Sequence, residues 1–224
     1  PRDRHEDSPM DDDSRLVRAN ALYERAIFGG DAGAVPAADR ELDGVEADLS
    51  LARGRVLHAR FLSERQEDPR EVALFERAAE LFQRLGDVRG EGEAAFWVGC
   101  FHQVVRGDSD LALPFFERSY QLASQVGDKL TLSYAARHLG FVYAEAGTLD
   151  AAHEKLDESV RLRREIGFDP GVAAGLLALA ELADRDGRPD DARALLDEAD
   201  AIAVASGADG IRRWIAEARA ELEA

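Results

Sequence analysis

Apolar residues recur along most of the chain at intervals of three and four positions, the spacing that places them on one side of an α-helix. Between Gly127 and Gly147 these positions are Leu132, Ala136, Leu139 and Tyr143. Between Gly147 and Gly167 they are Ala152, Leu156, Val160 and Ile166. The pattern predicts one helix of about 16 residues in each stretch.

Glycines divide this pattern with a period of 40 residues. One series consists of Gly107, Gly147 and Gly187, and a second consists of Gly127, Gly167 and Gly207. Helices commonly end in a residue with positive φ, a conformation that costs glycine little. Each period therefore predicts two helices, each closed by a glycine.

The second helix of each period carries a large apolar residue followed three positions later by a small one. The pairs are Phe75 with Ala78, Phe116 with Ser119, Leu156 with Ser159, and Leu196 with Ala199. We expect the large residue to fill the space between two paired helices, and the small one to let the helices approach closely.

These positions resemble the tetratricopeptide repeat over residues 69–207. The segment from Leu139 through Gly140 to Tyr143, followed by Ala152 and Leu156, fits that repeat well. The closing proline of the repeat is absent, and the 40-residue length is similar to that of arrays in large bacterial transcriptional regulators. The resemblance implies an all-α fold, a right-handed α-solenoid of antiparallel helix pairs. It also implies a non-enzymatic module that binds proteins or peptides in a concave groove.

The rest of the chain completes such an array. We predict a disordered acidic tail over residues 1–13 and a single repeat domain over residues 14–224, with about five helix pairs and a cap. The first pair is predicted at Leu16–Phe28 and Pro36–Leu49, and the next at Leu51–Glu64 and Glu71–Leu85. The last helix, Ile211–Leu222, would close the exposed end, with Trp214 and Ile215 on its apolar side.

In a tetratricopeptide array the first helix of each pair lines the groove. We therefore expect the partner or ligand to contact a set of residues spaced along these helices: Arg55, Phe96, Trp97, Cys100, Gln103, Tyr134, Arg137, His138, Phe141, Glu145, Leu177 and Glu181. Buried aromatics and arginine dominate many protein interfaces, which favours the middle of the array as the anchor. The competing interpretation is that most of these rings form the core between helices.

Composition and charge restrict the partners. The 45 acidic residues outnumber the 28 Lys and Arg residues, giving a net charge of −17, which argues against nucleic acid and against an anionic membrane surface. The single cysteine excludes an internal disulfide and fits a reducing compartment, so we expect a cytoplasmic protein. The groove keeps Arg55 and Arg137, so a small anion or metabolite is a further candidate ligand.

Signatures of catalysis are absent from the sequence. It contains no Gly-Lys of a P-loop, no Gly-x-Ser-x-Gly elbow and no His-Glu-x-x-His zinc motif, so we predict no metal and no cofactor. An alternative hypothesis is a small-molecule or catalytic pocket built from part of the groove set: Phe96, Trp97, Tyr134, Arg137, His138 and Glu145. A third is self-association through the N-terminal helix pair or the Trp214 helix. A regulatory sensor and a scaffold both remain open as cellular roles.

Overall fold

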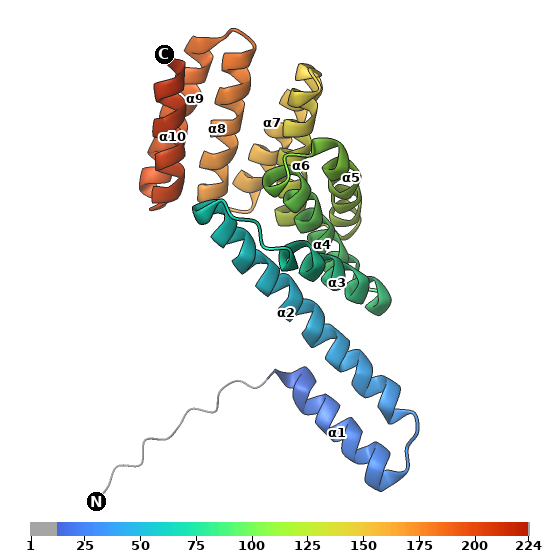
Figure 1. Cartoon of the computed structure of the whole chain (residues 1–224). Coiled ribbons are helices and arrows are strands. Elements are labelled where there is room, and N and C mark those ends of the chain that lie inside the picture. The colour runs from blue at the N-terminus through green and yellow to red at the C-terminus, as the bar shows by residue number, and fades with distance from the viewer. Residues whose placement is uncertain (1–12, 224) are drawn as a thin grey trace, which may run out of the picture. The chain divides into compact units, whose positions relative to one another are not determined.

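The computed structural model describes residues 13–223, and the secondary structure in that range is helical throughout (Figure 1). Apart from Asp13, the predicted acidic tail lies outside the described residues. The helices in chain order are α1 (Ser14–Gly29), α2 (Ala34–Glu64), α3 (Arg70–Leu85), α4 (Val88–Cys100), the π-helical segment η1 (Phe101–Val105), α5 (Ser109–Val126), α6 (Lys129–Glu145), α7 (Leu149–Glu165), α8 (Asp169–Arg185), α9 (Pro189–Ala205) and α10 (Asp209–Leu222). The predicted all-α class is confirmed.

The chain divides into two compact units, Pro1–Asp87 and Val88–Ala224, called unit 1 and unit 2 below. Unit 1 holds α1 to α3, and unit 2 holds α4 to α10. The single domain expected over residues 14–224 stays a prediction. Within residues 13–223, no helix is both long and apolar enough to span a membrane.

In unit 1, α2 runs unbroken through a position where the sequence predicted a boundary. We expected separate helices at Pro36–Leu49 and Leu51–Glu64, but both belong to one helix of 31 residues. Ser50 and Leu51 are buried within it, and residues 45–53 contain no glycine or proline that would end a helix. The prediction of two helices here is wrong, so the described residues hold ten α-helices rather than eleven.

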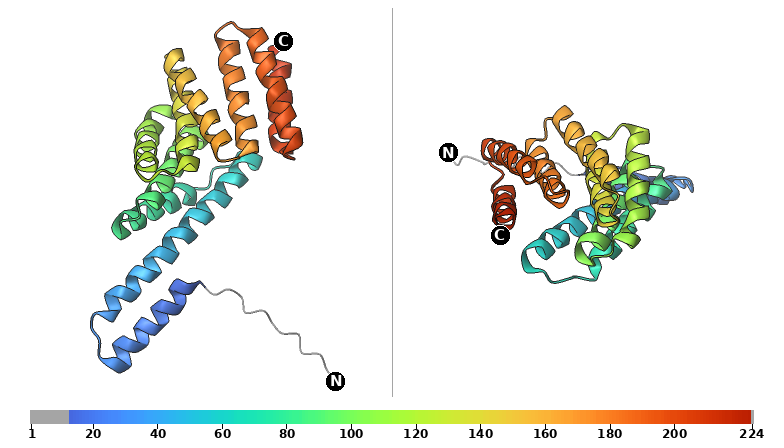
Figure 2. Two further views of the ribbon diagram at one scale, coloured as in Figure 1. Left: turned by 180° about the vertical axis from the view of Figure 1, so that it is seen from behind. Right: turned by 90° about the horizontal axis from the view of Figure 1, so that it is seen from above.

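In unit 2, successive helices run antiparallel and stack in pairs as an α-solenoid (Figures 1 and 2). The close approach within a pair depends on glycine. A Cβ atom at Gly99 would lie 2.7 Å from the ring of Phe116, and one at Gly140 would lie 2.8 Å from Leu156. In unit 1 a Cβ atom at Gly54 would lie 2.4 Å from Phe75. The large residues thus fill the space between paired helices, as predicted, and at these three contacts the residue that admits them is a glycine of the facing helix.

The helix ends follow the glycine pattern closely. The seven glycines from Gly86 to Gly207 that separate helices have φ between 65° and 76°. At the start of α5, Asp108 caps the helix by accepting a hydrogen bond from the Leu111 amide. Thr148 directly precedes α7, and its hydroxyl donates to the Tyr143 carbonyl near the end of α6.

The last helix packs on α8 and α9 through Ile215, which is fully buried. Trp214, expected on the same apolar side, is instead 45% exposed. Arg219 of α10 donates to the Asp197 carboxylate of α9 at 2.7 Å, which adds a polar contact at the edge of this packing. The capping role predicted for this helix is confirmed.

Candidate functional site

A cluster of aromatic rings joins the first helices of two successive pairs in unit 2. The Phe96 ring on α4 stacks on Tyr134 of α6 at 5.4 Å and meets the His138 ring edge-on at 5.2 Å. It also touches its neighbour Trp97 at 5.2 Å. Phe96 is 3% exposed, so it forms core between α4 and α6, while Trp97 and Tyr134 are half-buried.

His138 is held in a fixed orientation under these rings. Its Nδ1 lies 2.6 Å from the Oε1 atom of Gln103, and an amide oxygen can only accept, so Nδ1 carries the proton. The Gln103 amide nitrogen lies 3.4 Å from the His138 carbonyl and donates back to it. Two predicted groove residues therefore bind each other, which locks the imidazole rather than presenting it to a substrate.

Arg137 directly precedes His138 on α6. Its guanidinium carbon lies 4.5 Å from the centre of the Phe141 ring, in the geometry of a cation–π contact. The Nε atom is buried and has no hydrogen-bond partner within residues 13–223. Burial lowers the pKa of Arg137 from its usual value, and the nearby Glu181 carboxylate opposes that shift.

A second arginine, Arg163 of α7, is buried beside the same rings. It is 2% exposed, and its guanidinium carbon is 5.2 Å from the centre of the Tyr134 ring. Its Nη1 donates to the Gly171 carbonyl at 2.8 Å, and its Nε lies 3.3 Å from the Ser133 hydroxyl. Burial, followed by repulsion from Arg137, lowers the pKa of Arg163 to about 9, so the group stays charged at neutral pH.

Arg137 and Arg163, called the arginine pair below, thus bring two positive charges into one buried region. Among the described residues neither forms an ion pair with a carboxylate: Arg163 binds two neutral oxygens, and Arg137 contacts a ring. Glu181 lies close enough to act on the charge of Arg137 but forms no ion pair with it. Buried charges are normally paired, so this region has the electrostatic character of an anion-binding site.

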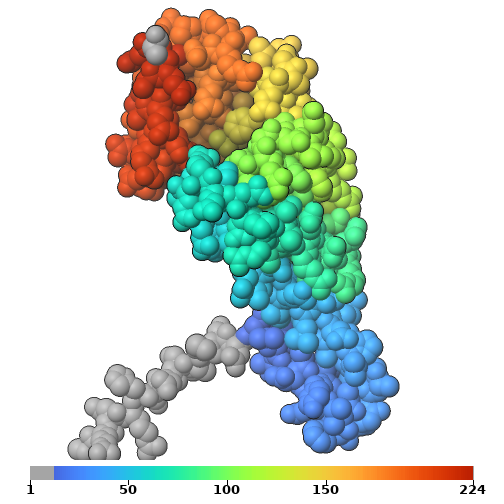
Figure 3. Space-filling view, viewed as in Figure 1, coloured from blue at the N-terminus to red at the C-terminus, as the bar shows by residue number. Residues whose placement is uncertain are grey.

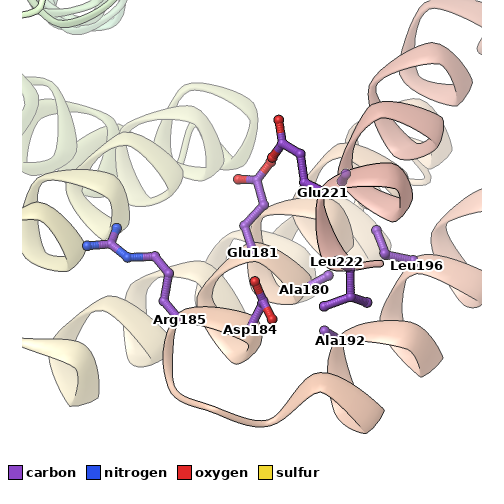
Figure 4. Close-up of a pocket in the computed structure, with 9 residues that line it drawn as sticks. Ala180, Glu181, Asp184, Arg185, Ala192, Leu196, Glu221 and Leu222 are labelled. Carbon is purple, nitrogen blue, oxygen red and sulfur yellow. The ribbon is translucent and has the colours of Figure 1, made fainter. Parts of the chain in front are cut away.

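An acidic pocket of about 190 Å³ lies between α8, α9 and α10 (Figure 4). The carboxyl groups of Glu181 and Glu221 point toward each other, whereas Arg185 points away. The side chain of Glu181 reaches solvent, but desolvation still raises its pKa. The charge of Arg137 opposes this rise in pKa, and the charge of Glu221 adds to it. Glu181 therefore belongs to this pocket as well as to the surroundings of Arg137.

The remaining predicted site residues lie elsewhere. Glu145 is exposed at the end of α6 and lines an open pocket of about 760 Å³ with residues such as Asp108 and Thr148. It stands eight residues beyond Arg137, about 12 Å along the helix, so these two do not form one compact site. Leu177 is buried in the core formed by α6 to α10, and Arg55 is exposed on α2 in unit 1.

Cys100 packs in the same core cluster as Phe96 and is 4% exposed. Cys100 therefore packs as a small buried thiol. His102, two residues later in η1, stacks on Phe115 of α5 at 5.6 Å, so the two side chains serve different contacts. No group of three or more potential metal ligands occurs in the part of the chain that the structure describes.

Arg163 is the residue that the sequence analysis missed. A signal was present, because Leu156, Val160 and Arg163 recur at four and three positions and so share one face of α7. An arginine on the apolar face of a helix is unusual, and charged residues are rarely buried without a partner. The apolar pattern was interpreted as continuing past this position to Ile166, which is exposed.

These features define an α-helical repeat protein with a buried basic region at the middle of its second unit. Residues 131–203, which carry the arginine pair, match the family model described as tetratricopeptide repeat. This segment therefore carries tetratricopeptide repeats, as the sequence pattern indicated. Such repeats are in general protein-interaction scaffolds and bind protein partners.

Comparison with solved structures gives a similarity to the crystal structure of BtubC (BKLC) from P. vanneervenii. The two chains are 14% identical with a TM-score of 0.49, and the alignment covers 88% of this chain and 93% of that one. A search of the curated proteins gives no match.

Proposed function

We propose that unit 2 binds a segment of a partner protein, and that an acidic group of this segment is held at the arginine pair. The observation that carries the proposal is the buried Nε of Arg137, which lacks a hydrogen bond within residues 13–223. A guanidinium offers donors in a fixed fork that matches a carboxylate, so an acidic side chain or a C-terminus is the chemistry that it fits.

The surroundings of Arg137 support the same choice. Phe141 and Tyr134 are half-buried rings beside the two guanidinium groups, and each holds one of them in a cation–π contact. Aromatic side chains together with arginine are enriched among the residues that dominate binding energy at interfaces. An anion here would also offset the mutual repulsion of the arginine pair, which the described carboxylates leave largely unopposed.

The net charge of −17 does not contradict an acidic ligand, because its effect is screened within about 10 Å at ordinary salt. The local field near Arg137 is set by the arginine pair and by Glu181. The concave groove as the binding surface, a role in a regulatory system and a cytoplasmic location stay predictions from the sequence. A small anion or metabolite would use the same donors as the acidic group of a peptide.

The experiment is a selection of random peptides displayed on phage against the full chain, followed by affinity measurements on the selected peptides. We expect them to share an acidic residue, and we expect Arg137→Ala combined with Phe141→Ala to weaken them at least about tenfold, the loss of one charge-assisted hydrogen bond. Arg164→Ala is the matched control, because Arg164 follows Arg163 on α7 but is exposed and pairs with Glu198. Selected peptides that bind the double variant as tightly as the unaltered chain would exclude this site.

A further inference from the structure

The α1–α2 hairpin of unit 1 has one edge closed by ion pairs. Arg15 of α1 lies 2.5 Å from Asp48 of α2, and Arg18 lies 2.7 Å from Glu41. Ala19, the one fully buried residue of α1, marks the side of that helix that packs on α2. The two helices run antiparallel (Figures 1 and 2), and the two ion pairs lie along one edge of this hairpin.

The opposite edge of the hairpin is apolar and exposed. With about 100° of rotation per residue, the side of α1 that lies across Ala19 from Arg15 and Arg18 carries three large apolar residues and Asn20. Four apolar residues of α2, each seven positions from the next, form a row beside Glu41 and Asp48, because two of them directly follow these carboxylates and so lie about 100° further around the helix. Between 42% and 61% of each residue in these two stripes is exposed, and their members are Leu16, Tyr23 and Ile27 on α1 and Val35, Leu42, Leu49 and Val56 on α2.

These two stripes, called the hairpin stripes below, have the spacing of a helix–helix interface. A seven-residue repeat of apolar residues keeps one face of a helix directed at a partner helix over its full length. The four stripe residues of α2 span 22 residues, about 32 Å of helix. Apolar surface of that extent, rimmed by charges, is typical of an interaction site rather than of scattered surface residues. In Figure 3, α1 and the first part of α2 form the blue part of the surface.

Charges beside the α2 stripe indicate what covers it. Asp39 and Glu46 flank the first half of the stripe, and Arg53 and Arg60 flank the second half, again at seven-residue intervals. Arg53 and Arg60 form no ion pair within residues 13–223, whereas Glu46 already binds Arg77 of α3 at 2.7 Å. If a second α2 helix ran in the opposite direction, its basic second half would face the acidic first half of this helix. Its acidic first half would likewise face the basic second half of this helix. Charges at such flanking positions set partner choice and orientation.

We propose that a second copy of this chain docks on the hairpin stripes, with its α2 antiparallel to the first, so that two α1–α2 hairpins form a four-helix bundle. The self-complementary charge pattern favours a second copy over an unrelated partner, since one two-fold axis satisfies both halves at once. The axis would pass near Leu49, midway between Glu46 and Arg53. This proposal concerns unit 1 and is independent of ligand binding by unit 2.

The test is the mass of the full chain in solution, measured by sedimentation equilibrium from about 1 to about 100 μM. We expect a dimer, and we expect Leu42→Glu combined with Leu49→Glu to give a monomer with an unchanged helical circular dichroism spectrum. Leu111→Glu is the matched control, because Leu111 is 53% exposed on α5 of unit 2, and it should leave the dimer intact. A monomer at every concentration, or a dimer that survives the double variant, overturns the proposal.

Charge exchange tests the antiparallel arrangement separately. One variant carries Arg53→Glu and Arg60→Glu, and the other carries Asp39→Arg and Glu46→Arg. The dimer of each variant alone should have a dissociation constant at least about tenfold higher than that of the unaltered chain, because like charges then face each other. An equimolar mixture should restore a dimer that contains one copy of each. Failure of the mixture to form this heterodimer would exclude the antiparallel arrangement of the two α2 helices.

Discussion

The Nδ1 atom of His58 lies 2.8 Å from the Oε1 atom of Glu71, and this pair joins α2 to α3 inside unit 1. Both side chains are buried, Glu71 completely. The second carboxylate oxygen of Glu71 is buried without a hydrogen-bond partner in the described part of the chain. A buried polar pair of this kind depends strongly on both members, because either one alone is costly to keep away from water.

We therefore expect His58→Ala to lower the free energy of unfolding by about 3 kcal/mol, since it leaves the Glu71 carboxyl buried without its partner. Replacing both residues by alanine should cost less than the sum of the two single changes. Urea denaturation of the full chain measures these values. Arg70→Ala is the control, because Arg70 is 72% exposed in its ion pair with Asp68 and should change stability by less than about 1 kcal/mol. A His58→Ala change as mild as the control would contradict the structural role of the pair.

A second prediction concerns the glycine at the close contact of α4 with α5. Gly99→Ala should destabilise the chain by about 1–3 kcal/mol, because the new Cβ would press on the fully buried Phe116 ring. Gly210→Ala in α10 meets nothing within 4 Å and should stabilise by about 0.5–1 kcal/mol through helix propensity. Opposite signs for the two substitutions in a thermal melt are the expected outcome. If both stabilise the chain, the contact at Gly99 is looser than described.

A third prediction separates the packing of Arg163 from its charge. Arg163→Ala should cost about 3 kcal/mol, because it opens a cavity and strands the Gly171 carbonyl. Arg163→Met should recover most of that loss, since an unbranched apolar side chain refills the space and removes a buried charge. Thermal unfolding of both variants, with Arg164→Ala as the exposed control, measures the difference. Equal losses for Ala and Met would show that the two hydrogen bonds outweigh packing.

A fourth prediction follows from the raised pKa of Glu181. The unfolded chain ionises this residue near its usual pKa of 4.5, while the folded chain holds the proton to a higher pH. Between these two values the folded state binds more protons, so stability falls as the pH rises through this window. Glu181→Gln should therefore raise the melting temperature at pH 7, and the gain should shrink as the pH falls toward 4.5.

Glu154→Gln is the control for that measurement, because Glu154 is an exposed glutamate on α7 away from the acidic pocket. We expect it to change the melting temperature equally little at both pH values. A gain from Glu181→Gln that is independent of pH would mean that the effect comes from packing, and it would contradict the electrostatic account of the pocket.

Much of the fold could be predicted because its signals are local. Each helix from α5 to α9 is followed by a glycine whose positive φ a side chain would strain, and a small residue such as Gly140 lies where Leu156 fills the gap. The continuity of α2 could not be predicted in this way. The apolar period of a helix is the same on both sides of Ser50, and only a stop signal distinguishes one long helix from two.

The candidate site was predictable only in part. The spacing of first helices correctly brought Phe96, Tyr134 and His138 together, because residues 40 apart occupy equivalent places in adjacent repeats. It also grouped Glu145 with them, although that residue lies further along the same helix. Arg163 was not predicted because the apolar pattern of the second helices indicates packing alone. The burial of a charge depends on contacts with α6 and α8 that no local pattern in α7 specifies.

The glycines between helices have a consequence for how such a chain changes in length. A Cβ atom added at any of the glycines with positive φ would meet no other atom within 4 Å. The turns at these glycines are therefore independent of the packing around them. Residues 128–167 begin after one such glycine and end on another, which makes them a cassette with matching ends. Duplicating or deleting that cassette would preserve both flanking turns, so genetic recombination could lengthen or shorten the stack one whole repeat at a time.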